Sequence, residues 1–251
     1  MDETINLKRI PRLFLNAPLA QGARIAPDRD KCHYLTHVLR LRPGDHARVF
    51  NARDGEWLCA IEKADRKACA VVCLEPLPAL PAPADIDYIF APLKRARLDY
   101  MAQKATEMGV RRLRPVITEF TIARRVNLAR LAANAVEAAE QCNIVHVPQV
   151  VEPAPLEDLL ANWEKTDAGR TLICCDEAAP VTNPVTALQG APRGPLAVLI
   201  GPEGGFSDSE RDMLRTRDFV LPISLGPRIL RADTAAVAAL ALVQAVLGDW
   251  C

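Results

Sequence analysis

The stretch that decides the fold is Leu199–Glu210, "LIGPEGGFSDSE". An apolar run ends in the glycine-rich turn Gly201–Gly205, and Ser207 with Glu210 then forms an S-x-x-E capping box that predicts a helix start. The turn lacks the Gly-Lys-Ser/Thr of a phosphate-binding loop and the G-x-G-x-x-G of a dinucleotide fold, and it carries an acid, Glu203. Its simplest interpretation is a structural turn. If it binds a ligand, we expect one that backbone groups and apolar walls hold without a phosphate clamp.

A second loop of the same kind follows about twenty residues later in the sequence. The apolar run "LPISL" leads into "GPRILRADT", and a helix is predicted from Ala235. Both loops open with Gly-Pro, which makes a tight turn that exposes backbone groups. In open α/β sheets, ligands bind beyond the carboxyl ends of the strands. An adenosine-type cofactor without phosphates, such as S-adenosylmethionine, suits two such loops.

The chain around these loops alternates between predicted strands and helices. The strands are apolar throughout rather than alternating, which is typical of a parallel α/β sheet covered on both faces. The predicted strands are "DYIFAPL", "LRPVIT", "HVPQV", "TLICCD", "LAVLI" and "FVLPISL". A helical stripe from Leu98 to Met108 ends at Gly109, and another helix is predicted from about Asn127 to Gln141.

The first part of the chain has a different composition. Short β-prone runs such as "ARVFN", "EWLCAIEK" and "ACAVVCLE" predict a β-rich domain, with one short helix that ends at Pro43-Gly44. A proline-rich spacer, "EPLPALPAPAD", separates it from the rest. We therefore predict a β domain at residues 1–75, a linker at 76–85 and an α/β domain at 86–251.

Composition limits the partners and the compartment. Lys+Arg and Asp+Glu both number 31, so a nucleic-acid partner needs a local basic patch. The eight cysteines (Cys251 among them) form no C-x-x-C pair, which predicts reduced thiols of a cytosolic protein and no metal site. The opening "MDETINLKRIPRLFL" has early acids and predicts no signal peptide. The longest apolar run, 235–247, is shorter than the ~20 residues of a membrane span, so no membrane partner is expected.

Both Gly-Pro loops, with "QKATEMGVRRLRPV", "EAAEQC", "RLFL" and "HVLRLRPGD", closely resemble the RsmE family. These are 16S ribosomal RNA (uracil-1498-N3)-methyltransferases of the SPOUT superfamily. The resemblance implies a C-terminal SPOUT α/β domain with a deep trefoil knot, which is a rare exception to unthreaded chains. It also implies an N-terminal PUA-like β-barrel, S-adenosylmethionine as cofactor, a homodimer, and 16S rRNA, within the small ribosomal subunit, as the partner.

The resemblance places the cofactor against three loops. The residues expected there are Leu172, Cys174, Ile200, Gly201, Pro202, Gly204, Gly205, Leu225, Gly226, Ile229, Leu230 and Arg231. The chain departs from the family pattern at three places outside the Gly-Pro turns. Asp233 stands where a Glu is usual, Asn143-Ile144 replaces a Gly-Arg pair, and "EFTIAR" stands where an Arg-Ser pair is common.

Arg228, Arg231 and Glu203 are the candidate catalytic residues. Methylation at N3 requires loss of the imide proton, and an Arg beside the carbonyl oxygens would stabilise the negative charge that develops on the ring. Solvated surface side chains are the alternative for both arginines and for Glu203. Asp233 is a possible proton acceptor, although a helix N-cap is the preferred interpretation. No histidine lies in either loop.

Basic clusters at the ends of elements predict an RNA groove, although any one of them is most often a solvated face. The candidates are Arg9, Arg12, Arg40, Arg42, Lys94, Arg95, Arg97, Arg111, Arg112 and Arg124, with Arg114 and Arg125 in the same clusters. Few aromatic residues accompany them, so base-stacking platforms are not predicted. The helix at 235–247 is apolar on every side except at Gln244, which suits a dimer seam or a domain core. The alternative functions are a related SPOUT methyltransferase for another rRNA or tRNA position, and a non-catalytic RNA-binding protein of this fold.

Overall fold

The computed structural model describes residues 6–65, 68–179 and 183–250. The opening "MDETI" and Cys251, which the sequence analysis considered, lie outside these residues. The chain divides into two compact units: one comprises Met1–Ala82 with Glu140–Val147, and the other comprises Pro83–Ala139 with Pro148–Cys251. The first division falls within the proline-rich spacer. The return of 140–147 to the N-terminal unit is a feature that the predicted boundaries do not include.

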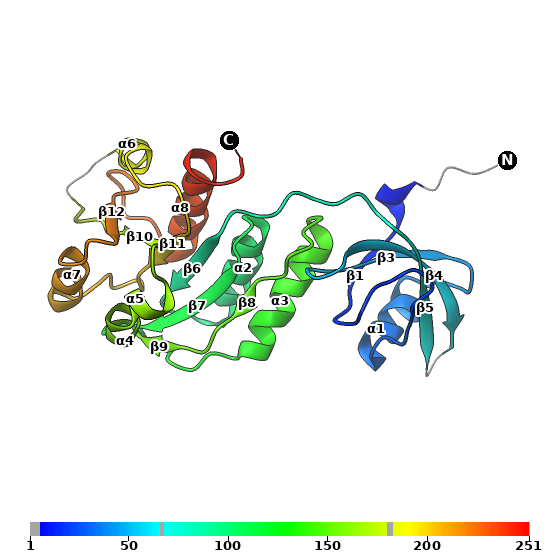
Figure 1. Cartoon of the computed structure of the whole chain (residues 1–251). Coiled ribbons are helices and arrows are strands. Elements are labelled where there is room, and N and C mark those ends of the chain that lie inside the picture. The colour runs from blue at the N-terminus through cyan, green and yellow to red at the C-terminus, as the bar shows by residue number, and fades with distance from the viewer. Residues whose placement is uncertain (1–5, 66–67, 180–182, 251) are drawn as a thin grey trace. The chain divides into compact units, whose positions relative to one another are not determined.

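The N-terminal unit is built on a five-stranded sheet with the order β1-β3-β4-β5-β2 (Figure 1). The strands are β1 (Arg12–Phe14), β2 (Arg24–Ile25), β3 (His46–Asn51), β4 (Gly55–Ala64) and β5 (Cys69–Pro76). The helices are η1 (Leu7–Arg9), α1 (Arg29–His33) and the π-helix η2 (Tyr34–Val38). All strand pairs are antiparallel except β1 with β3. Alternate residues of β3, β4 and β5 point into one core, so the predicted β domain is confirmed.

The C-terminal unit contains a parallel sheet with the order β12-β10-β11-β6-β7-β8, and β9 pairs with β7. The strands are β6 (Ile86–Phe90), β7 (Arg112–Ile117), β8 (Gln149–Val150), β9 (Ala154–Pro155), β10 (Thr171–Cys175), β11 (Leu196–Ile200) and β12 (Val220–Ile223). The helices are α2 (Arg95–Glu107), α3 (Leu128–Gln141), α4 (Leu156–Ala161), α5 (Trp163–Thr166), α6 (Pro184–Gln189), α7 (Asp208–Arg215) and α8 (Ala232–Val246). Every pairing in this sheet is parallel, as the continuous apolar strands predicted.

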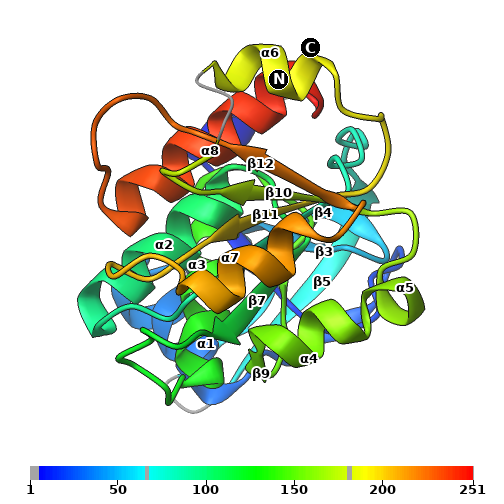
Figure 2. The same cartoon turned by 90° about the vertical axis from the view of Figure 1, so that its left-hand side faces the viewer.

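Helices cover both faces of this sheet (Figure 2). On one face, α4, α5 and α7 pack on Ile89, Leu172, Cys174 and Leu199. On the other face, α8 packs on β11, on α2 and on α6. The two faces use alternate residues of the same strands, which is why every position of β6 and of β11 is buried. The predicted class, a parallel α/β domain that follows a β-rich domain, is confirmed.

The carboxyl ends of four strands meet at one edge of the sheet. Ile200 pairs with both Cys175 and Phe90, and Ile223 pairs with Cys175. The loops that follow β10, β11 and β12 therefore lie at this edge, as the rule for open α/β sheets predicts. After the last of them, α8 begins at Ala232, three residues before the predicted start.

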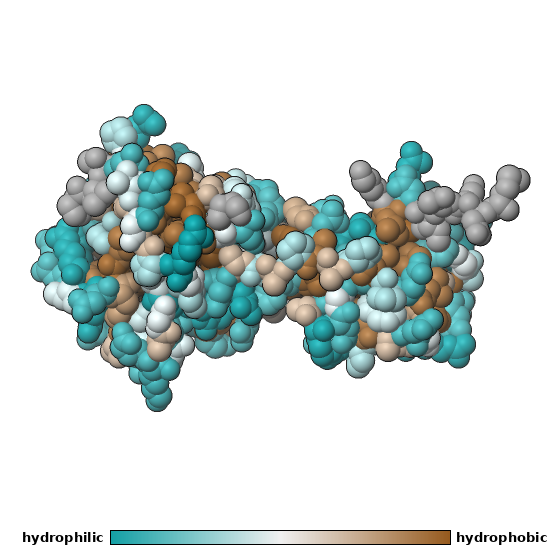
Figure 3. Space-filling view, turned by 45° about the horizontal axis from the view of Figure 1, so that its top comes forward, coloured by the Kyte–Doolittle hydropathy of each residue, from teal (hydrophilic) through white to brown (hydrophobic). Residues whose placement is uncertain are grey.

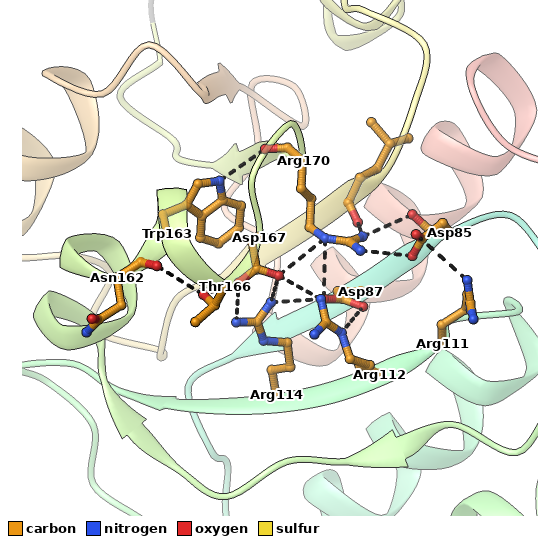
Figure 4. A network of polar contacts seen from close by, with 11 residues as sticks. Asp85, Asp87, Arg111, Arg112, Arg114, Asn162, Trp163, Thr166, Asp167 and Arg170 are labelled. Atoms are coloured by element: carbon orange, nitrogen blue, oxygen red, sulfur yellow. Dashed lines mark hydrogen bonds and ion pairs between the residues drawn. The ribbon is translucent and has the colours of Figure 1, made fainter.

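A buried network of ion pairs lies at the opposite edge, where the strands begin (Figure 4). Asp87 of β6 and Asp167, after α5, bind Arg112 and Arg114 of β7, and the N–O distances run from 2.5 to 2.9 Å. Arg170 approaches both carboxylates and also pairs with Asp85 at 3.0 Å. The Asp87 and Asp167 side chains have no exposed surface. The network joins β6, β7 and the start of β10 without any contribution from the loops at the other edge.

Candidate functional site

A pocket of about 230 Å³ opens at the carboxyl edge of the parallel sheet. Three loops form it: the ones after β10, β11 and β12, together with the start of α8. Its lining residues are Cys175, Asp176, Glu177, Ile200, Gly201, Pro202, Glu203, Gly204, Gly205, Phe206, Arg211, Ser224, Leu225, Gly226, Arg228, Ile229, Leu230, Ala232 and Ala235. The structure thus brings together the two Gly-Pro loops that the sequence singled out, although they are about twenty residues apart in the chain.

Packing within the chain explains the glycines of the first loop. A Cβ on Gly201 would lie 3.1 Å from the ring of Phe206, and one on Gly204 would lie 3.2 Å from the Cβ of Phe120. Gly205 has φ +70°, a conformation that side chains disfavour. The loop therefore needs small residues for its own fold, whatever ligand it meets.

The capping box that follows the loop is confirmed. The Ser207 hydroxyl accepts a hydrogen bond from the Glu210 backbone N–H at 3.3 Å, and the Glu210 carboxylate accepts one from the Ser207 N–H at 2.9 Å. Glu210 also accepts a bond from the Glu119 N–H at 2.8 Å. This single carboxylate fixes the start of α7 and ties the turn after β7 to it.

The second loop leaves room for a ligand. Gly226 has φ +104°, and a Cβ there would meet nothing within 4 Å. Arg228 is exposed, and 87% of Ile229 is exposed. Arg228 and Arg231 form no ion pair with any residue that the structure describes. Two guanidinium groups are therefore available beside an open wall of the pocket.

An acidic cluster with one arginine lines the opposite side of the pocket. Asp176 and Glu177 directly follow β10, and Arg211 of α7 lies 3.4 Å from Asp176 and 3.7 Å from Glu177. Sequence reasoning placed the cofactor near residues 172–176, which include Asp176, but gave Glu177 and Arg211 no role, although the position of Glu177 just after a strand's carboxyl end was a usable signal. The pocket therefore has polar lining residues as well as the apolar wall that Ile200, Leu225 and Leu230 form.

Glu203 is held by an arginine of a neighbouring helix. Arg97 of α2 donates to its carboxylate at 2.9 Å, and the Arg97 Nε lies 4.0 Å from the carboxylate of Asp233. Arg97, which the sequence assigned to RNA, thus bridges the first Gly-Pro loop and the start of α8. Asp233 lies in the first turn of α8, whose N-cap is Arg231, so the predicted N-cap role of Asp233 is wrong.

Two residues with buried ionisable groups lie beside the pocket. Burial raises the pKa of the Cys175 thiol to about 12. Burial also raises the pKa of the Tyr88 hydroxyl well above its ordinary value, and this hydroxyl lies 3.4 Å from the Met101 sulfur. Both groups are therefore protonated at neutral pH, and neither is a ready general base.

Nine of the twelve residues expected to contact the cofactor line the pocket. The three exceptions are Leu172, Cys174 and Arg231. Leu172 and Cys174 point into the core under α4 and α7, because alternate residues of a strand face opposite sides. Cys175, the next residue along, reaches the pocket instead. These two positions correct the sequence-based set.

The structure also separates the arginines that were expected to bind RNA. Arg12 is buried, pairs with Glu56 at 2.8 Å and donates to backbone carbonyls of 140 and 144, so it is a structural residue. Arg112 and Arg114 belong to the buried network at the far edge of the sheet. The predicted RNA contacts of Arg12 and Arg112 are therefore withdrawn. The residues that stay exposed are Arg9, Arg40, Arg42, Lys94, Arg95, Arg111, Arg124 and Arg125.

Two family descriptions together match most of the chain. Residues 80–244 match an RNA methyltransferase domain, and residues 27–73 match an RNA methyltransferase PUA domain. Within the described residues, no group of His, Cys, Asp and Glu side chains is arranged to hold a metal ion. Nor does the described part of the chain contain a helix that is long and apolar enough to cross a membrane.

Known proteins resemble the chain over nearly its full length. The ribosomal RNA small subunit methyltransferase E of Rickettsia conorii is 30% identical over 242 residues, which cover 96% of this chain and 97% of that protein. That of Buchnera aphidicola from Schizaphis graminum is 27% identical over 253 residues, covering 96% and 98%. A crystal structure of the Neisseria gonorrhoeae enzyme bound to S-adenosyl methionine superposes with a TM-score of 0.86 at 26% identity, covering 96% of this chain and 100% of that one.

Proposed function

Because the chain belongs to the RsmE family of RNA methyltransferases, we infer that it transfers a methyl group from S-adenosylmethionine to a uridine of 16S ribosomal RNA. The observation that carries this proposal is the pocket at the two Gly-Pro loops, in a chain whose two units both match the family. The reaction site is N3 of the base, and the substrate is the RNA within the small ribosomal subunit. The enzyme acts in the cytoplasm, where these subunits are assembled.

The pocket suits the cofactor in shape and chemistry. A Cβ on Gly226 would meet nothing within 4 Å, so this loop leaves space for a ligand. Ile200, Leu225 and Leu230 supply apolar walls for an adenine ring, and the carboxylate of Asp176 supplies an acceptor for hydroxyl or ammonium groups. No cationic phosphate clamp is needed for such a ligand. When bound, the cofactor supplies an electrophilic methyl group.

The chain's own residues then act on the base. Loss of the N3 imide proton gives the ring a negative charge that spreads onto the carbonyl oxygens, and transfer of the methyl group to N3 neutralises this charge. We propose that Arg228 and Arg231, which form no ion pair with other described residues, stabilise these oxygens. Glu203 is already neutralised by Arg97, so its role is to fix the loop rather than to accept the proton.

A homodimer is part of the proposal. Helix α8 buries Ala236, Leu240 and Val243 against its own unit, while Ala238 and Ala241 stay half-exposed. A helix that is apolar on all sides and covered on one leaves an apolar face for a second copy. Apolar surface on the C-terminal unit is visible between hydrophilic residues in Figure 3. The trefoil knot that the resemblance implies stays a prediction.

The test is methylation of small ribosomal subunits from cells that lack this gene. Purified protein and labelled S-adenosylmethionine are incubated with these subunits, and the modified nucleotide is mapped by mass spectrometry. One methyl group at N3 of a single 16S uridine is the expected result. Methylation of another rRNA position or of tRNA, or the absence of any methylation, would contradict the proposal. Calorimetric titration with S-adenosylmethionine would show whether the protein is instead a non-catalytic RNA-binding protein that does not bind the cofactor.

A further inference from the structure

Phe120 is a half-exposed phenyl ring at the same edge of the sheet as the pocket. It follows β7 directly, and 45% of its surface is exposed. Its Cβ packs against Gly204, at 3.2 Å from the position that a Cβ there would take. Phe120 itself does not line the pocket, although Gly204, which its side chain contacts, does.

The turn that carries this ring is rigid. The Thr121 hydroxyl accepts a hydrogen bond from the Thr118 N–H at 2.9 Å and lies 2.8 Å from the Thr118 hydroxyl. Both threonines are buried, and the Glu119 N–H donates to Glu210 of the capping box. The chain therefore fixes Phe120 in a solvent-facing position although burial of the ring would be favourable. An aromatic ring held in this way contacts a partner with little loss of conformational entropy.

Two exposed arginines follow the ring within five residues of the chain. Arg124 and Arg125 follow it in the chain, are exposed, and have no ion-pair partner among the described residues. Ile122, which lies between Phe120 and these arginines in the chain, is 74% exposed and adds apolar surface to this turn. A planar apolar face with nearby guanidinium groups is what an unpaired nucleotide requires, because its base stacks while its phosphate is neutralised.

We propose that Phe120 is a stacking platform for an unpaired base of the RNA substrate. Since the ring lies outside the cofactor pocket, the base that it holds is a neighbour of the uridine that is methylated. Phe120 is thus a positioning residue, and it acts on substrate binding rather than on methyl transfer. This role was not predicted from the sequence, because few aromatics accompany the basic clusters. The proposal rests on the proposed function, since it requires an RNA substrate.

The first test compares Phe120→Leu with Phe120→Trp. Leucine keeps apolar contact with Gly204 but removes the aromatic face. We expect Phe120→Leu to raise KM for small ribosomal subunits about tenfold, with kcat and cofactor affinity unchanged, because base–aromatic stacking is of this order. Phe120→Trp should keep a normal KM. The matched control is Tyr100→Leu, since Tyr100 is an equally exposed aromatic (43%) of the same unit and should tolerate the change.

A second test reads stacking directly. The added fluorescence of Phe120→Trp, relative to the unsubstituted protein, should be quenched when a single-stranded RNA oligonucleotide containing uridine is added. A normal KM in Phe120→Leu, or no quenching, would overturn the proposal. So would a KM defect accompanied by dissociation of the oligomer in light scattering, because the ring would then contact a protein. If the unsubstituted protein methylates no 16S RNA, the proposed function fails, whereas the quenching experiment still decides whether Phe120 stacks on RNA.

Discussion

Replacement of Asp167 by Asn should destabilise the C-terminal unit by about 3 kcal/mol. The Asp167 carboxylate accepts hydrogen bonds from Arg112 at 2.6 Å, from Arg114 at 2.7 and 2.8 Å, and from Thr166 at 2.9 Å. Removal of one partner from a buried ion pair costs about 3–5 kcal/mol. We take the lower end because 29% of the Arg112 side chain is exposed, so water replaces part of what is lost.

The pKa of Asp167 gives a second value for the size of this destabilisation, and it also gives the direction in which the destabilisation changes with pH. Hydrogen bonds from Arg114 and the charge of this arginine oppose the effect of burial and lower the Asp167 pKa to about 2, from 3.8. At 1.36 kcal/mol per pKa unit, this corresponds to about 2–3 kcal/mol of preference for the charged form. A lowered pKa stabilises the fold above pH ~4, and that stability is lost as the pH falls through ~2. The difference between the variant and the unsubstituted protein should therefore shrink between pH 4 and pH 2.

The assay is urea unfolding followed by the fluorescence of Trp163, in a background that carries both Trp57→Phe and Trp250→Phe. Trp163 stacks on Phe219 and donates to the carbonyl of Arg170, so its emission reports on this unit. The control is Glu107→Gln, in a partly exposed pair with Lys104 on α2, which should cost less than ~1 kcal/mol. The reasoning is refuted if Asp167→Asn costs less than ~1 kcal/mol at pH 7, or if its cost does not change with acid.

Three further outcomes are expected. Arg228→Ala or Arg231→Ala should lower single-turnover methylation about a hundredfold while cofactor affinity changes little, and normal rates at saturating RNA would make both arginines RNA-positioning residues. Light scattering should show twice the 27.5 kDa chain mass, and Ala241→Arg should give a monomer; a fully active monomer of the unsubstituted chain would contradict the dimer. Burial raises the pKa of the Cys175 thiol to about 12, so maleimide should label Cys175 more slowly at pH 7 than the exposed Cys142. Bound cofactor should slow the labelling of Cys175 further. Equal labelling rates for the two cysteines would contradict this prediction and show that the Cys175 thiol is accessible from the pocket.

The features that depend on residues close together in the chain could be predicted from the sequence. Apolar strands followed by Gly-Pro turns, and a Ser and a Glu three residues apart, predicted the carboxyl edge of the sheet and the start of α7. The sequence was not sufficient where a side chain's partner is distant in the chain. Arg12 and Arg112 have the same appearance in the sequence as Arg124, and only the fold shows that carboxylates 44 and 25 residues away bind the first two. Cys175 lines the pocket and Cys174 does not, because alternate residues of β10 face opposite sides of the sheet. The sequence alone does not show which of the two faces the pocket.

The passage of residues 140–147 into the N-terminal unit has a consequence for how this chain can be divided. The backbone crosses between the two units three times, after Ala82, after Ala139 and after Val147. A cut in the proline-rich spacer would therefore not release the β unit with all of its partners. The buried Arg12 would lose two backbone acceptors, and the Phe14 N–H would lose the carboxylate of Glu140. The two units have separate cores, but a single cut in the gene cannot separate them. Any chimera has to transfer the 140–147 segment together with the N-terminal unit.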